Sequence, residues 1–301
     1  MSVSALPGRW CVSIRSLTKI WLVLLLMLSA NGCTIAREAL YAPRESPIDI
    51  REWTNTPPEE IKVVTSDGLT LTGYYWPGDP DDKDIVVFFH GRGAHQGVGA
   101  KYAQYIAGHG DNVLVASYRG FGGNPGQPSK PGLLKDADAF IAEARKRAGA
   151  GARLWLVGHS LGSAVALQAA IRDAHPAGVF AIGAFANISD ATPLGLGALL
   201  PDQWNNVEQI EQLKAPIILF HGGKDDVVPA SSSEELLEAA SGPAAFISMK
   251  DWTHKPVMQK LGPWISHAIE TMRGGKVDML PELLKGWSLA GSHPQCQDCM
   301  H

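Results

Sequence analysis

The stretch Leu154–Ala164 constrains the fold of this chain more than any other. It reads as a short apolar strand, then Gly-x-Ser-x-Gly over residues 158–162, then the first turn of a small-sided helix. Such a unit predicts that Ser160 lies on a tight strand-to-helix turn, with its hydroxyl exposed at the carboxyl end of a sheet. The backbone N–H of Leu161 then lies at a helix N-terminus, where an oxyanion is stabilised. We therefore predict that Ser160 is a nucleophile and Leu161 an oxyanion donor.

Length and composition favour one sizeable α/β domain. The chain has 301 residues, of which 45% are hydrophobic, enough to bury a single large core. Its formal net charge of -4 argues against nucleic acid as a main partner. Apolar strand-like runs are followed by helical patterns, which predicts a mostly parallel sheet of about eight strands with helices on both faces. The predicted strands are residues 61–65, 69–76, 85–89, 113–117, 154–157, 179–184, 216–221 and 245–249.

The first 33 residues resemble an export signal with a bacterial lipoprotein cleavage box. Arg9, Arg15 and Lys19 form a basic region, residues 20–28 are continuously apolar, and Cys33 stands where a lipid would be attached. The alternative is an uncleaved signal anchor, although the apolar run is short for a membrane span of about 20 residues. Both predict an exported body tethered to a membrane, on the periplasmic or extracytoplasmic side.

Three further segments follow this leader. Residues 34–60 are polar and proline-bearing and predict a spacer, residues 61–272 carry the α/β pattern, and residues 273–301 form a C-terminal tail. Without residues 1–32 the body has 23 basic and 30 acidic residues, a net charge of -7. Such a body is not drawn to anionic lipid by charge, so the N-terminus must supply the tether.

The tail contains Cys296 and Cys299 at Cys-x-x-Cys spacing, with a histidine on each side. Three outcomes remain open: an unstructured tail, a disulfide in an exported protein, or a zinc site. A single Cys-x-x-Cys lacks the usual second pair of ligands, so no metal and no cofactor is predicted.

A serine hydroxyl becomes a good nucleophile only when a base takes its proton and a third group orients that base. Asp225 and Asp226 both follow the predicted strand over 216–221, and His254 follows the last strand. The order serine, acid, histidine at late strand ends is the one expected for this sheet. His221 and His267 are the nearest competitors of His254 for the role of base.

These motifs together resemble the α/β-hydrolase superfamily from about residue 61 to residue 272. The chain is most similar to the branch of exported or membrane-associated serine hydrolases that includes Bem46-like and lidless acyl-thioesterase members. The resemblance is carried by His90-Gly91-Arg92-Gly93, Tyr118-Arg119-Gly120-Phe121-Gly122, residues 158–162, His221-Gly222-Gly223-Lys224-Asp225 with Val228-Pro229, and His254.

The resemblance implies a catalytic role for three side chains and two backbone groups. Because the acid of that branch lies four residues before the proline of the Val-Pro pair, it favours Asp225 over Asp226, with Ser160 and His254 as its partners. The second oxyanion donor maps to the backbone of Arg92, with Gly91 as the alternative.

The implied function is hydrolysis of an ester or thioester of a small or acyl substrate through a covalent acyl-enzyme. Two alternatives are a serine peptidase of the same fold and a non-catalytic, membrane-tethered binding lipoprotein. The segment 187–213 is the one long insertion without a predicted strand, and it predicts a small cap or an open site.

Overall fold

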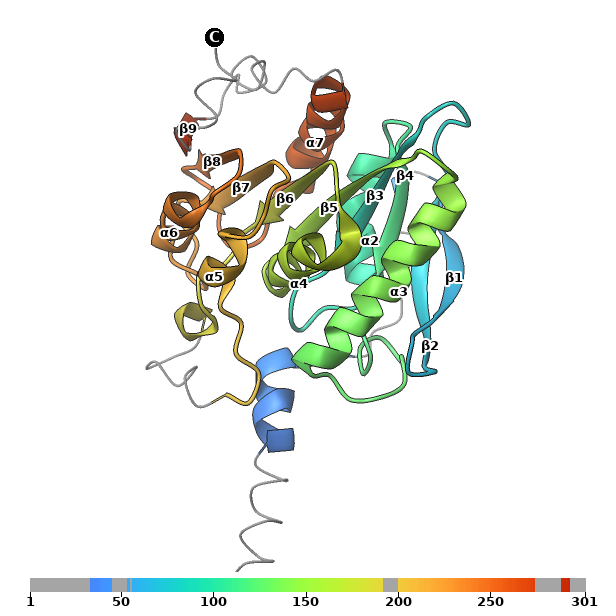
Figure 1. Ribbon diagram of the computed structural model, residues 1–301, viewed down its shortest axis with the longest axis horizontal. Helices are drawn as coiled ribbons and strands as arrows, with labels where there is room; N and C mark the ends of the chain where they lie inside the picture. Colours follow the sequence, from blue (N-terminus) through green and yellow to red (C-terminus); the bar gives the residue numbers. More distant parts are fainter. Residues whose placement is uncertain (1–32, 45–52, 55, 192–199, 274–287, 293–301) are drawn as a thin grey trace, which may run out of the picture.

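The computed structural model describes residues 33–44, 53–54, 56–191, 200–273 and 288–292. Within these ranges nine strands form one sheet in the order β1-β2-β4-β3-β5-β6-β7-β8-β9 (Figure 1). The strands are β1 (Glu59–Val64), β2 (Thr70–Trp76), β3 (Asp84–Phe89), β4 (Asn112–Ala116), β5 (Arg153–His159), β6 (Gly178–Ile182), β7 (Ile217–Gly222), β8 (Ala244–Met249) and β9 (Ser288–Ser292).

The six strands from β3 to β8 run parallel, and β1, β2 and β9 are antiparallel to their neighbours at the two edges. The prediction of about eight strands in a mostly parallel sheet is confirmed. The ninth strand corrects the expectation that residues 273–301 are only a tail, because β9 pairs with β8 through Ser248↔Ser288 and Ala245↔Ser292. A five-residue edge strand carries little periodicity of its own, and its partner strand supplies the pairing.

Helices cover both faces of the sheet, as predicted (Figure 1). One face packs against α2 (Gln96–Ala107) and α7 (Met258–Arg273), which also contact each other. The helices that cover the opposite face are α3 (Lys130–Ala148), α4 (Leu161–Ala169), α5 (Asn206–Ile210) and α6 (Ser231–Ala239).

The central strand β3 shows why its sequence lacks alternation. Ile85, Val87 and Phe89 belong to the core on the α3/α4 side, whereas Val86 and Phe88 belong to the core on the α2/α7 side. A strand buried on both faces needs an apolar residue at every position.

The chain crosses from one half of the sheet to the other between β3 and β5. These strands are neighbours although β4 lies between them in sequence, and Phe89 pairs with Gly158 at their carboxyl ends. Ligands bind at such a switch point in open α/β sheets, because the loops that leave the two strands diverge and open a crevice between them. The loop after β3, residues 90–95, and the turn at Ser160 both lie at this edge of the sheet and border the crevice.

Residues 33–41 form a helix, named here the N-terminal helix, which packs against the body (Figure 1). Tyr41 is fully buried, and its hydroxyl donates a hydrogen bond to Asp202 Oδ2 at 2.9 Å. Arg37 also binds Asp202, with Nε–Oδ2 at 2.9 Å and Nη2–Oδ1 at 3.0 Å. The expectation of a spacer over residues 34–60 is thus corrected for this part, since a buried tyrosine and a partner 161 residues away hold it.

The segment 187–213 is described outside residues 192–199. Its parts are a 3-10 turn (Ile188–Ala191) and α5, and α5 packs against α4 and α6. Trp204 is fully buried, with its Nε1 3.3 Å from the Tyr41 hydroxyl.

Candidate active site

Ser160 lies on the turn between β5 and α4 in a conformation that non-glycine residues rarely adopt. Its φ is 53° and its ψ is -118°, and its N–H donates to the Ile182 carbonyl at 2.8 Å. Such a backbone costs about 1–3 kcal/mol and persists only where the surroundings enforce it. A Cβ at Gly158 would lie 2.4 Å from the Gly162 oxygen, and one at Gly162 would lie 2.0 Å from the Phe89 oxygen. Gly158 is therefore required for the turn to close on itself, and Gly162 is required for it to pack against the end of β3.

Asp225 and His254 are joined by a hydrogen bond. His254 Nδ1 lies 2.8 Å from Asp225 Oδ2, and Asp225 Oδ1 accepts the N–H groups of Val227 and Val228 at 2.9 Å each. Burial acts to raise the pKa of Asp225, but hydrogen bonds from His221, His254 and the two N–H groups outweigh it and hold the pKa well below its usual range. The carboxylate is thus ionised, and it fixes the proton of His254 on Nδ1.

Two of the competing candidates lie elsewhere. Asp226 is exposed and forms none of the hydrogen bonds to His254. His267 is an exposed residue of α7 whose Nδ1 lies 3.5 Å from Glu270.

His221 is fully buried beneath the Asp225 loop, where sequence reasoning treated it only as a rival base. Its Nε2 lies 2.9 Å from the Val228 carbonyl and 3.3 Å from Asp225 Oδ2, while Nδ1 lies 2.7 Å from Ser233 Oγ. A carbonyl can only accept, so Nε2 carries the proton and Nδ1 accepts the Ser233 hydroxyl. His221 therefore holds the Asp225 loop in place.

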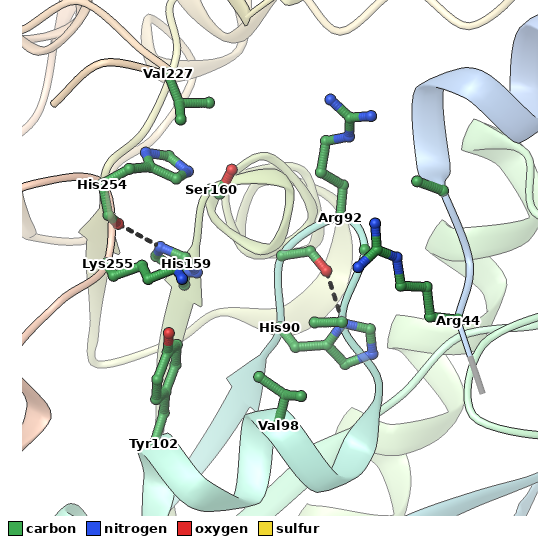
Figure 2. Close-up of a pocket in the computed structure, with 14 residues that line it drawn as sticks. Arg44, His90, Arg92, Val98, Tyr102, His159, Ser160, Val227, His254 and Lys255 are labelled. Atoms are coloured by element: carbon green, nitrogen blue, oxygen red, sulfur yellow. Dashed lines mark hydrogen bonds between the residues drawn. The ribbon is translucent and has the colours of Figure 1, made fainter. Parts of the chain in front are cut away.

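His159 supports His254 from the other side. Its Nε2 donates to the His254 carbonyl at 2.9 Å, and the two rings lie 5.1 Å apart between centroids (Figure 2). Burial and the neighbouring His254 lower the pKa of His159 to about 4, so it is neutral at pH 7. Tyr102 of α2 packs its ring edge-on against His159 at 5.6 Å. Sequence reasoning missed the supporting role of His159, because its position between Gly158 and Ser160 gives no sign that it binds the His254 carbonyl.

The loop after β3 lies directly against Ser160. A Cβ at Gly91 would lie 3.2 Å from the Ser160 Cβ, so the loop backbone approaches as closely as glycine allows. His90 Nδ1 donates to the Gly91 carbonyl at 2.9 Å, and the Tyr118 hydroxyl donates to the His90 carbonyl at 3.1 Å. Burial lowers the pKa of His90 to about 3, which keeps the ring neutral.

Two backbone N–H groups remain available at this point. In the part of the chain that the structure describes, the N–H groups of Leu161, the first residue of α4, and of Arg92 donate no hydrogen bond. The Arg92 side chain has a separate task, because its Nη2 donates to the Ala39 carbonyl at the end of the N-terminal helix at 3.0 Å.

A pocket of about 360 Å³ opens above these groups. Figure 2 shows that Ser160 and His254 both line this pocket, Ser160 from the turn after β5 and His254 from the loop after β8. The lining comes from the N-terminal segment, the loop after β3, α2, the Ser160 turn and the loops after β7 and β8. The lining residues are Ala42, Arg44, His90, Gly91, Arg92, Gly93, Ala94, Val98, Tyr102, His159, Ser160, Val227, His254 and Lys255.

The remaining candidates lie apart from this pocket. Cys33 is an exposed free thiol at the beginning of the described chain, and Cys296 and Cys299 lie outside the described residues. Over the described ranges, no three His, Cys, Asp or Glu side chains are grouped to hold a metal ion. No helix in those ranges combines the length and apolar character needed to cross a bilayer.

Comparison with known proteins identifies the family. A family model described as serine aminopeptidase, S33, matches residues 80–201. The uncharacterized protein Rv2307c of Mycobacterium tuberculosis is 32% identical over 218 residues, which cover 70% of this chain and 77% of that protein. Protein bem46 of Schizosaccharomyces pombe is 24% identical over 212 residues, 64% of this chain and 71% of its own.

Among solved structures, the Pyrococcus furiosus esterase Pf2001 superposes with a TM-score of 0.59 at 16% identity, over 75% of this chain and 98% of the esterase. This likeness extends over the whole fold of that protein. The chain belongs to the α/β-hydrolase family and is Bem46-like, as the sequence motifs indicated.

Proposed function

We propose that this protein is a serine hydrolase that cleaves ester or thioester bonds through Ser160, His254 and Asp225. The observation that carries the proposal is the 2.8 Å hydrogen bond from His254 to Asp225 at the pocket where the strained Ser160 presents its hydroxyl. With the proton held on Nδ1, Nε2 of His254 has a lone pair for the serine proton.

The reaction proceeds in two steps, acylation of Ser160 and hydrolysis of the acyl-enzyme. Ser160 Oγ forms a bond to the carbonyl carbon while its proton passes to His254, and the carbonyl oxygen takes negative charge between the N–H groups of Leu161 and Arg92. The bond to the leaving oxygen or sulfur then breaks, and His254 gives that atom the proton. Water repeats the sequence on the acyl-enzyme, which releases the acid and restores Ser160.

A peptidase is the second candidate, because the matching family model is described as a serine aminopeptidase. An aminopeptidase must hold the free ammonium of its substrate, and a carboxylate is the side chain suited to that task. The described lining of the pocket contains no Asp or Glu, but it contains Arg44, Arg92 and Lys255. This charge pattern favours an ester over a peptide with a free N-terminus.

Hydrolysis assays with 4-nitrophenyl esters, thioesters and amino-acid anilides test the proposal. We expect turnover of esters or thioesters, a loss of about 10⁴-fold or more in Ser160→Ala, and no loss in the exposed control Ser231→Ala. Unchanged turnover in a folded Ser160→Ala protein would exclude the mechanism. Anilides cleaved faster than esters would favour the peptidase, and a folded wild-type protein without any turnover would favour a binding protein.

We further propose that the body is exported and held at a membrane through Cys33 or an uncleaved leader. Supporting this, Cys33 is exposed and is the first residue of the docked N-terminal helix. Full-length protein expressed in a bacterium should fractionate with membranes, and Cys33→Ser should release it if the lipid is the anchor. Retention of Cys33→Ser at the membrane would favour the uncleaved leader, and soluble wild-type protein would refute the tether.

A further inference from the structure

Three cationic side chains line the pocket, and they come from three separate segments. Arg44 follows the N-terminal helix, Arg92 belongs to the loop after β3, and Lys255 follows His254 (Figure 2). All three are exposed, and the described lining has no carboxylate to oppose them. The pocket is therefore cationic, although the chain has a net charge of -4.

Among the described residues, two of these cations have no carboxylate partner, whereas some exposed cations elsewhere on the chain are paired. Lys62 pairs with Glu60 at 3.1 Å, and Lys224 pairs with Asp251 at 2.7 Å. Over the part of the chain that the structure describes, no carboxylate pairs with the side chain of Arg44 or of Lys255.

Arg92 differs because its guanidinium is fixed. One nitrogen donates to the Ala39 carbonyl at 3.0 Å, which holds the group at the pocket and ties the N-terminal helix to the loop after β3. The remaining N–H groups are still donors, since a guanidinium has five. Guanidinium groups match carboxylate and phosphate oxygens in geometry as well as in charge.

The two buried histidines of the pocket, His90 and His159, do not change its charge. Burial lowers the pKa of His90 to about 3 and that of His159 to about 4, so both are neutral at pH 7. The lining also contains apolar side chains, namely Val98 and Tyr102 from α2 and Val227 from the loop after β7. A lining of apolar and cationic side chains suits a substrate that is apolar at one end and anionic at the other.

We propose that the pocket selects esters that carry a carboxylate or phosphate group, with Arg44 and Lys255 as the residues that determine this specificity. The proposal rests on the proposed serine hydrolase function and names its substrate class. The anionic group takes no part in the bond changes and is bound by the cations of the pocket. A substrate with a free ammonium is repelled by the same charges.

Matched pairs of esters test the proposal on the full chain. The first pair is 4-nitrophenyl hexanoate and mono-4-nitrophenyl adipate, which differ by a carboxylate on the acyl side. The second pair is methyl 4-acetoxybenzoate and 4-acetoxybenzoate, which places the carboxylate on the alcohol side. We expect kcat/KM to favour the anionic member of at least one pair by about tenfold, mainly through KM. Tenfold corresponds to about 1.4 kcal/mol.

Variants then assign the preference to residues. Arg44→Gln and Lys255→Gln should each reduce the anionic-to-neutral ratio of kcat/KM by about three- to tenfold, and Arg44→Lys should restore part of it. Lys214→Gln, an exposed lysine outside the pocket lining, should leave the ratio as it is. Because the charges are exposed, raising the ionic strength from 0.05 to 0.5 M should also reduce the ratio in the wild type.

The outcomes separate this proposal from the one on which it rests. Turnover of both members of each pair without preference, or a preference unchanged in Arg44→Gln and Lys255→Gln, would overturn the anionic substrate class and leave the hydrolase intact. Absence of turnover in a folded protein would instead remove both.

A last comparison separates the sources of the anionic group. Two esters of glycerol phosphate are compared: one has a hexanoyl chain and is dissolved in water, and the other has an oleoyl chain and is embedded in phosphatidylcholine vesicles. Faster turnover in solution would assign the pocket to soluble esters, and faster turnover in vesicles to lipid headgroups. If an active enzyme hydrolyses neither phosphate ester but prefers the carboxylate esters, the substrate class is restricted to carboxylates. If it hydrolyses neither phosphate ester and shows no carboxylate preference, the anionic substrate class is overturned.

Discussion

Replacing Asp225 by asparagine should disable the enzyme while leaving the pocket unaltered. The carboxylate accepts the His254 N–H through Oδ2 and the N–H groups of Val227 and Val228 through Oδ1. An amide has only one accepting oxygen. If that oxygen stays with the two backbone donors, the new NH₂ faces His254 Nδ1 and drives its proton to Nε2, where it meets Ser160.

The expected loss is large because the base is present in the wrong tautomer. An analogous asparagine substitution in a serine protease triad lowers kcat about 10⁴-fold, which corresponds to about 5.5 kcal/mol of barrier. The reverse orientation of the amide preserves the tautomer, but it sets the NH₂ against two N–H donors, at a cost of about 1–3 kcal/mol for each buried group left without a partner. Asp225→Asn should therefore lose between 10³- and 10⁴-fold in kcat with little change in KM.

The assay is ester hydrolysis at pH 7 to 8, with circular dichroism and urea unfolding to confirm that the variant is folded. Asp226→Asn is the matched control, since it removes a neighbouring exposed carboxylate that does not contact His254. Activity of Asp225→Asn within tenfold of the wild type, or equal losses in both variants, would show that Asp225 does not set the tautomer of His254.

Three further predictions follow from the described contacts. On the acid side of the pH profile, kcat/KM should fall with a slope of no more than one proton, because the Asp225 carboxylate stays ionised there; a slope of two would contradict this. Asp136→Asn removes the negative charge and one of the two acceptor oxygens beside the buried Arg119, whose Nη2 lies 2.7 Å from Asp136 Oδ1, and should cost about 3–5 kcal/mol in urea unfolding, whereas a change below 1 kcal/mol would show that the pair contributes little. Asp202→Ala removes the acceptor of the Tyr41 hydroxyl and should cost about 2–3 kcal/mol and raise KM through the pocket wall; an unchanged KM would show that the N-terminal segment is not part of the site.

Much of the fold follows from local patterns that the sequence displays directly. The buried strands read as apolar runs because both of their faces are covered, and the turn at Ser160 needs glycine at 158 and 162 for backbone clearance. The sequence predicts that Asp225 and His254 each follow a late strand; in the structure these strands, β7 and β8, pair, and a hydrogen bond joins the two residues, whose catalytic role stays a prediction.

The rest depends on contacts between distant segments. Tyr41 and Asp202 are 161 residues apart, so no local pattern indicates that the N-terminal helix docks on the body and that Ala42 and Arg44, which follow it, line the pocket. His159 and His221 are recognised as supports only when their carbonyl partners are known. The edge strand β9 gains its structure from β8, and its own five residues do not specify it.

Covalent labelling shows whether Ser160 is an activated nucleophile. The folded protein is treated with a fluorophosphonate, and the adduct is located by peptide mass spectrometry in the wild type, Ser160→Ala and Asp226→Asn. We predict one adduct per chain, on Ser160, absent from Ser160→Ala and retained in Asp226→Asn. No adduct on a folded wild-type protein, or an adduct on another residue that persists in Ser160→Ala, would contradict the account.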